Sequence, residues 1–266
     1  MYKTLSIRLS ATGGLPHGAD YYPEQWLDRP DVLERDIELM QAAGITTVTM
    51  GVFAWSMLEP EEGRFDFDWL RERFERLHRA DIRVVLATPT GAPPRWLTRT
   101  YPDVLRTAPD GRRNPPGRRL NFCPSSPRYR ELTSRLISRL ATEFGRHPAL
   151  ALWHVNNELA WSCHCNSCQE RFRAWLQERY SSLEALNRAW NTPFWSARFS
   201  CWEEIEPPAI LDGMEHQRHE DGTLPGLTLD WRRFASWLNA DFLRHEIACL
   251  RAAGSTAPVT TNTWGL

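Results

Sequence analysis

An uncharged, β-branched segment between two helical patterns is the strongest constraint on how this 266-residue chain folds. Residues 45–52 read ITTVTMGV and carry no charge, which is typical of a strand buried on both faces. A helix is predicted before this segment, over residues 31–44, and another after it, over residues 66–80. A doubly buried strand flanked by helices indicates a parallel sheet with helical crossovers.

The same alternation continues along the chain. Further strands are predicted over residues 15–22, 83–87, 149–155 and 258–263, and further helices over residues 128–144, 168–180, 182–190 and 227–253. Long connections, residues 91–127 and 193–226, follow the third and fourth strands at their carboxyl ends. In a barrel of this type those ends form the catalytic face, and a closed barrel needs about eight such strands. The pattern supplies five of them.

The charge balance argues against several kinds of partner. The chain has 32 basic and 33 acidic side chains, a formal net charge of -1, which disfavours binding to nucleic acid or to anionic lipid. No apolar run approaches the roughly 20 residues that span a bilayer, and the first residues lack the apolar core of a signal peptide. We expect a cytoplasmic protein. The 13 Trp residues either stack on sugars or fill a core, and composition does not separate these roles.

A cysteine cluster predicts a metal site. Cys163, Cys165 and Cys168 lie within six residues just before a predicted helix, and Cys123 ends the earlier long connection. Three thiols so close together cannot all form structural disulfides, and a cytosolic location disfavours disulfides in any case. Four thiolates match a closed, tetrahedral, structural zinc site. His164 is an alternative to Cys123 as the fourth ligand, and a metal-free loop is the alternative to the whole site.

A glutamate directly after the fourth predicted strand is the candidate catalytic group. Barrel enzymes place catalytic side chains at this end of a strand, so Glu158 is a candidate general acid, the alternative being a solvated loop residue. Asn157 beside it either holds a sugar hydroxyl or caps the turn. Glu24 and Glu59 also follow strands but stand among loop-like residues, and we expect surface roles for both.

Several stretches together resemble one enzyme family, the β-galactosidases of glycoside hydrolase family 42. They are YYPEQW at 21–26, FAWSMLEP at 53–60, TPT at 88–90, PPRWL at 93–97, NNE at 156–158 and AWNTPFW at 189–195. They keep the order of that family from about residue 15 to residue 266. The chain is therefore similar to the N-terminal catalytic domain of such an enzyme.

The resemblance implies a fold, an activity and a set of site residues. It implies a TIM (β/α)8 barrel, of which about the first five β/α units are present, that removes terminal β-D-galactose with retention of configuration. Glu158 would be the general acid/base, Asn157 and Arg119 would bind substrate, and Trp195 would form a wall of the sugar pocket. Zinc would be held by the four cysteines, Cys123, Cys163, Cys165 and Cys168. Members of the family are commonly homotrimers.

Two departures limit the resemblance. Where some members carry Arg and then Glu near the second strand end, this chain has Thr49 and Val52, so sugar contacts there are not carried over. Retention needs a second carboxylate about 5–5.5 Å from the acid, which the family takes from its seventh strand. We therefore expect residues 1–266 to be an incomplete, inactive portion of the barrel domain. The alternatives are a hydrolase for another β-glycoside and a non-catalytic, zinc-stapled module that binds carbohydrate or protein.

Overall fold

A parallel sheet forms the centre of the molecule. The computed structural model describes residues 16–159, 162–208 and 224–263. Within them five strands pair in the order β1-β2-β3-β4-β5, every pair parallel. The strands are β1 (Gly18–Tyr21), β2 (Thr47–Met50), β3 (Arg83–Ala87), β4 (Leu150–His154) and β5 (Val259–Thr260). All five predicted strands are confirmed, with shorter bounds at most ends.

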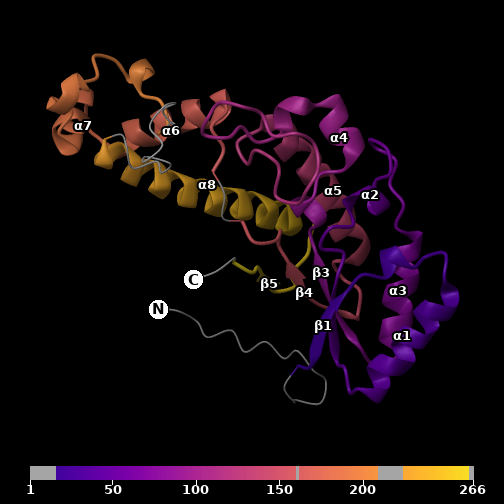
Figure 1. Cartoon of the computed structure of the whole chain (residues 1–266). Coiled ribbons are helices and arrows are strands. Elements are labelled where there is room, and N and C mark those ends of the chain that lie inside the picture. The colour runs from indigo at the N-terminus through magenta and orange to yellow at the C-terminus, as the bar shows by residue number, and fades with distance from the viewer. Residues whose placement is uncertain (1–15, 160–161, 209–223, 264–266) are drawn as a thin grey trace.

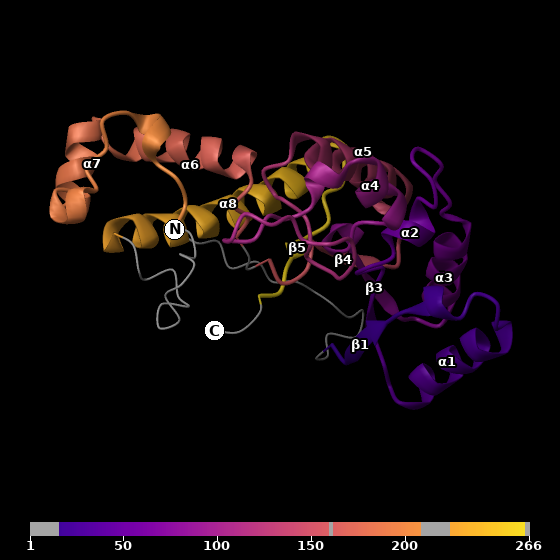
Figure 2. The same cartoon turned by 45° about the horizontal axis from the view of Figure 1, so that its top comes forward.

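The order of the strands identifies the winding of the chain. Each strand lies beside the one before it, and the helices α1 (Pro30–Ala42), α3 (Asp68–Arg79), α5 (Pro127–Phe144) and α8 (Pro225–Ala252) occupy the successive crossovers. Figures 1 and 2 show these helices wrapped around one side of the sheet. Right-handed crossovers that always advance in one direction keep every helix on the same side, as in a barrel, whereas a doubly wound sheet reverses direction.

The main core lies between the sheet and these helices. Val48 and Met50 of β2 are paired in register with Val84 and Leu86 of β3, and all four side chains are buried. The alternate residue Thr49 is partly exposed, because it faces the side of the sheet that these helices leave uncovered. The predicted apolar stripe of the second helix, now α3, packs into this core through Leu70, Phe74 and Leu77.

Two short helices were absent from the sequence-based prediction. Helix α2 (Trp55–Leu58) follows β2, and α4 (Arg95–Thr100) lies inside the connection predicted to be irregular. Helices of four and six residues are too short to show helical periodicity in a sequence. They make the connections after β2 and β3 more compact than the sequence suggested.

A second group of helices extends away from the sheet. Helices α6 (Asn166–Arg179) and α7 (Leu183–Trp190) project with the first half of α8, as Figures 1 and 2 show. Ser182 caps α7 by accepting a hydrogen bond from the Ala185 amide at 3.1 Å. These helices enclose their own apolar cluster, which includes Phe172 and Trp231. Together with the buried Trp55 and Trp153 of the main core, Trp231 shows that part of the tryptophan content fills cores.

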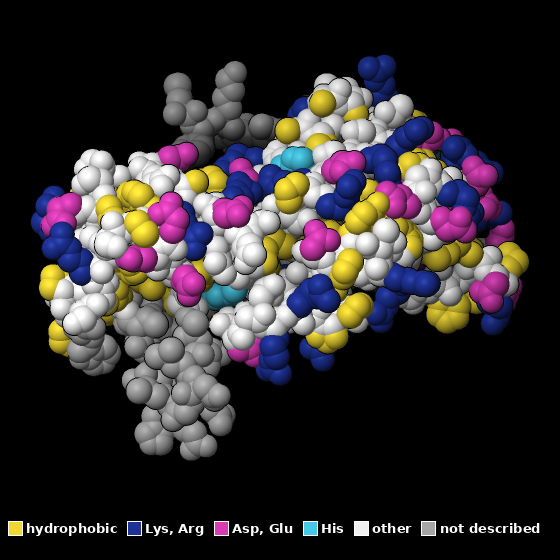
Figure 3. All heavy atoms as spheres, turned by 90° about the horizontal axis from the view of Figure 1, so that it is seen from above, with side chains coloured by type: hydrophobic (Ala, Val, Ile, Leu, Met, Phe, Trp, Pro, Cys, Tyr) yellow, Lys and Arg dark blue, Asp and Glu magenta, His cyan; other side chains and the backbone are white. Residues whose placement is uncertain are grey.

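The surface carries both signs of charge. Basic and acidic side chains intermingle over the face shown in Figure 3. No helix among the described residues is both long and apolar enough to cross a membrane.

Candidate active site and metal centre

Residues 156–158 leave β4 in a tight turn. The φ angles of Asn156 (57°) and Glu158 (48°) lie in the left-handed region, which is uncommon for residues other than glycine. The Asn156 amide donates to Thr88 Oγ1 at 2.7 Å, and its side-chain Nδ2 donates to Thr90 Oγ1 at 2.7 Å. The Asn157 amide donates to Asn156 Oδ1 at 2.8 Å. The TPT motif after β3 therefore holds the turn that carries the candidate catalytic glutamate.

The side chain of Glu158 is paired with an arginine from a distant loop. Arg119 comes from the long connection between β3 and α5, and its Nη1 lies 2.9 Å from Glu158 Oε2. The same guanidinium lies over the ring of Phe53, 5.7 Å from its centroid, just after β2. The side chain of Glu158 is 22% exposed and its Oε2 atom is buried, so the carboxylate is largely shielded from solvent.

A residue after β5 completes the cluster. Asn262 Oδ1 accepts the Glu158 amide at 3.0 Å, and its Nδ2 donates to Asn157 Oδ1 at 3.2 Å. The structure thus brings together Glu158, Asn157 and Arg119, three of the predicted site residues. It adds Asn262, which the sequence analysis missed. The sequence feature that could have pointed to Asn262 is its position near the carboxyl end of the last predicted strand, residues 258–263.

The predicted sugar-pocket wall stays a prediction. Trp195 belongs to the short turn Phe194–Ser196, which follows α7 in the projecting helices. Its side chain lies outside the described part of the structure.

The expected surface role of Glu59 is wrong. Its side chain is fully buried and accepts hydrogen bonds from Trp55 Nε1 at 2.9 Å, from the Gly63 amide at 2.8 Å and from Arg135 Nη2 at 2.6 Å. The partner Arg135 comes from α5, 76 residues along the chain, so no local pattern reveals the pair. Glu24 is half-buried rather than freely exposed, and burial raises the pKa of its carboxyl group.

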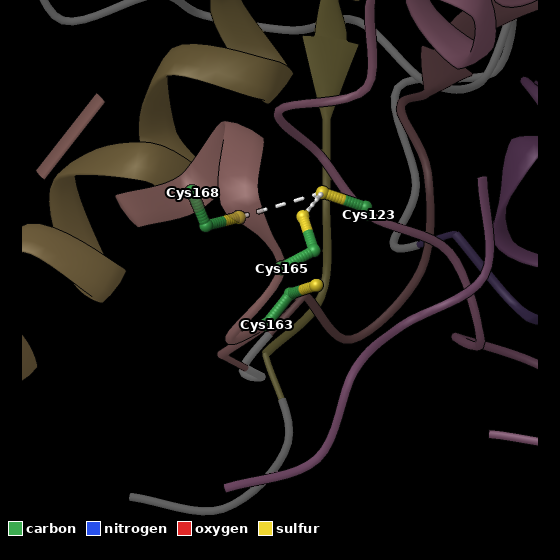
Figure 4. Close-up of side chains that lie close together, drawn as sticks. All are labelled: Cys123, Cys163, Cys165 and Cys168. Atoms are coloured by element: carbon green, nitrogen blue, oxygen red, sulfur yellow. Dashed lines mark hydrogen bonds between the residues drawn. The ribbon is translucent and has the colours of Figure 1, made fainter. Parts of the chain in front are cut away.

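The four predicted cysteines form one cluster. Their Sγ atoms all lie within 4.8 Å of one another, and Cys123 Sγ is 3.4 Å from the sulfurs of both Cys165 and Cys168. Figure 4 shows Cys168 at the start of α6 and Cys123 on the neighbouring loop, with their thiols pointing toward each other. Zinc–sulfur bonds of about 2.3 Å in a tetrahedron place sulfurs about 3.8 Å apart, so the spacing fits one such ion.

The structure decides between Cys123 and His164 as the fourth ligand. The His164 ring packs against Trp231, with centroids 4.8 Å apart, and does not belong to the ligand group. Arg106 lies beside the sulfurs and donates to the Ser162 carbonyl oxygen. Since four thiolates around one divalent ion leave two negative charges, the half-buried guanidinium of Arg106 is favourably placed.

The fold and the site together define a class of protein. The one-way parallel winding, with polar side chains gathered at the carboxyl ends of the strands, is that of TIM-barrel enzymes. The catalytic domain of a β-amylase from Paenibacillus polymyxa shares this fold, with a TM-score of 0.71 at 16% identity, over 92% of this chain and 65% of that one. Within the class, residues 20–266 match the model of glycoside hydrolase family 42, described as beta-galactosidase. The chain belongs to this family.

Individual relatives agree with the family assignment. The β-galactosidase BglY of Alicyclobacillus acidocaldarius is 49% identical over 252 residues, which cover 95% of this chain and 36% of that protein. The crystal structure of a β-galactosidase from Rahnella sp. R3 superimposes with a TM-score of 0.90 at 45% identity, over 96% of this chain and 36% of that one. The chain thus spans about 36% of the length of these relatives.

Proposed function

We propose that the protein carrying this chain is a retaining glycoside hydrolase that removes terminal β-D-galactose, with Glu158 as its general acid/base. The observation that supports this most directly is the placement of Glu158. It follows β4, its carboxylate contacts Arg119 and its amide is bound by Asn262, in a chain of the β-galactosidase family. Three segments from different parts of the chain thus meet at Glu158, Arg119 at its carboxylate and Asn262 at its backbone amide.

The chemistry divides between this chain and residues beyond it. Glu158 protonates the glycosidic oxygen as the bond to the leaving group breaks, and then takes a proton from the water that releases the sugar. Asn157 and Arg119 bind sugar hydroxyls, and Trp195 lines the pocket. The nucleophilic carboxylate lies outside residues 1–266, so these residues alone have no hydrolase activity.

The cysteine cluster has a structural role in this proposal. Cys123, Cys163, Cys165 and Cys168 would hold a zinc ion that ties the connection after β3 to the start of α6. A tetrahedral site filled by four thiolates leaves no open position for substrate, so the ion would supply stability rather than catalysis. By the family relation we also propose that the complete protein is a homotrimer.

The test uses the complete gene product, read to its natural stop codon, and its Glu158→Gln variant. Hydrolysis of a β-galactoside with a poor leaving group is expected to fall about 10²- to 10⁴-fold in the variant, because proton donation is lost. A Glu61→Gln variant is the matched control, since Glu61 is an exposed glutamate whose side chain is 73% exposed. Proton NMR of the first product formed should show the β-anomer.

Other outcomes would contradict specific parts of the proposal. Full activity in Glu158→Gln would remove Glu158 from the mechanism, and an α-anomer as first product would exclude retention. Faster turnover of β-fucosides, β-glucosides or arabinosides would keep the mechanism and change the substrate. No turnover of any aryl glycoside by the complete protein would favour a binding module instead.

A further inference from the structure

A buried glutamate interrupts the apolar face of α8. The helix presents Leu238, Phe242, Glu246 and Leu250 at intervals of four residues, and all four side chains are buried. Glu246 is 0% exposed and forms no ion pair with any described residue. A buried carboxylate without a cation is costly and requires other compensation. Its compensation is a set of hydrogen bonds directed at the candidate active site.

Three neutral donors surround this carboxylate. Oε2 accepts from Thr88 Oγ1 at 2.7 Å, and Oε1 accepts from Thr90 Oγ1 at 2.5 Å and from Asn156 Nδ2 at 3.1 Å. Both threonine hydroxyls also accept hydrogen bonds from Asn156, each at 2.7 Å. A hydroxyl has one proton to donate, so each threonine accepts from Asn156 and donates to Glu246. Both carboxylate oxygens then act only as acceptors, as in the ionised form.

We propose that Glu246 is a positioning residue for Glu158. Through Thr88 and Thr90 it fixes Asn156 in the left-handed turn that sets the direction of Asn157 and Glu158. Left-handed backbone at residues other than glycine persists where surrounding contacts over-determine it, and here they come from the segment after β3 and from α8. This inference rests on the proposed role of Glu158 as the general acid/base. It also gives a role to the TPT motif, which substrate contacts leave unexplained.

Burial and the neighbouring groups act on the ionisation of Glu246 in opposite directions. Desolvation raises the pKa of Glu246 to about 7, while the hydrogen bonds from Thr90, Thr88 and Asn156 oppose the rise. The titratable groups that face it come from α5. Tyr129 donates a hydrogen bond to the Thr90 carbonyl oxygen at 2.5 Å, and Arg130 acts at longer range. The carboxylate is thus enclosed by the network and by one helix, with no access for substrate.

The experiment measures how activity depends on the leaving group in the complete gene product. Glu246→Gln keeps the shape of the side chain but removes one acceptor, so the acid/base should lose its alignment. We expect kcat for a methyl β-galactoside to fall about 10- to 100-fold, since small misplacements of catalytic groups cost up to about 10²-fold. The 2,4-dinitrophenyl β-galactoside needs no proton donor, and its glycosylation rate, measured in the pre-steady state, should change less than about threefold.

Two threonine variants provide a matched pair. Thr88→Val removes the bridging hydroxyl and should reproduce the leaving-group dependence of Glu246→Gln, whereas Thr88→Ser keeps the hydroxyl and should restore most of the activity. Asp241→Asn is the control for charge, because Asp241 lies on the same helix but pairs with Arg130 and Arg171. Asp241→Asn should lower the rates for the two substrates by the same factor or leave both rates unchanged.

The outcomes separate this inference from the proposed function. Equal loss on both substrates in Glu246→Gln, with a lowered melting temperature, would show a merely structural role and overturn the inference. Unchanged activity on both would overturn it as well. If Glu158→Gln itself showed no dependence on the leaving group, the proposed function would fail, and the positioning role with it. A dependence on the leaving group in Glu158→Gln and in Glu246→Gln supports the proposed function and the positioning role together.

Discussion

Removal of one sulfur ligand tests the metal centre most directly. Cys168→Ser deletes a buried thiol that lies 3.4 Å from Cys123 Sγ. We expect the parent protein to contain about one zinc per chain, as one tetrahedral site requires, and the variant to contain almost none. Cys201→Ser is the matched control, because Cys201 is an exposed cysteine outside the cluster. Its zinc content should equal that of the parent.

The expected loss of stability follows from the loop that the metal closes. Cys123 and Cys165 are 42 residues apart in the chain, and the ion would link them as a crosslink does. The loop-closure entropy for that separation is worth about 4 kcal/mol at 25 °C. For a domain of about 150–250 residues, each kcal/mol of unfolding free energy shifts the melting temperature by about 2–4 °C. We therefore expect Cys168→Ser to melt about 10 °C below the parent.

Metal analysis and thermal unfolding, with and without a strong chelator, check both numbers. The chelator should lower the melting temperature of the parent to that of Cys168→Ser and should leave the variant unchanged. A parent that purifies without metal, and whose melting temperature neither added zinc nor a chelator alters, would refute the assignment. The four thiols would then be only a packed cluster.

Two further predictions concern buried carboxylates. Glu59→Ala leaves the donors Trp55 Nε1, Gly63 N and Arg135 Nη2 without an acceptor. The free energy of unfolding, measured with urea, should fall by about 4 kcal/mol. Glu62 is a neighbouring carboxylate that is 34% exposed and lies 3.7 Å from Arg135, so Glu62→Ala should cost less than about 1 kcal/mol. Equal losses in the two variants would contradict the reasoning. The pKa of Glu246 is raised from 4.5 to about 7, so its contribution to stability is full below pH 4.5 and is lost as pH rises to about 7. The loss should be about 3 kcal/mol relative to Glu246→Gln, and parallel pH profiles for the two proteins would contradict it.

The secondary structure could largely be predicted because burial leaves a local mark. An uncharged β-branched run such as residues 45–52 indicates a strand between two layers, and the stripe of Leu70, Phe74 and Leu77 indicates a helix packed on a core. The prediction failed where an element is short, as in α2 and α4. It also failed for Glu59, whose partner Arg135 is 76 residues away.

The sequence by itself determined the longer elements, the group of Cys163, Cys165 and Cys168, and the position of Glu158 directly after a strand. Each of these depends on spacing within a few residues. Only the tertiary structure decided that Cys123 rather than His164 joins the cluster, that Asn262 contacts Glu158, and that Glu246 lies under the active-site turn. These contacts join residues up to 158 positions apart. The one-way winding of the chain brings the strand ends and α8 together, and no local spacing encodes that approach.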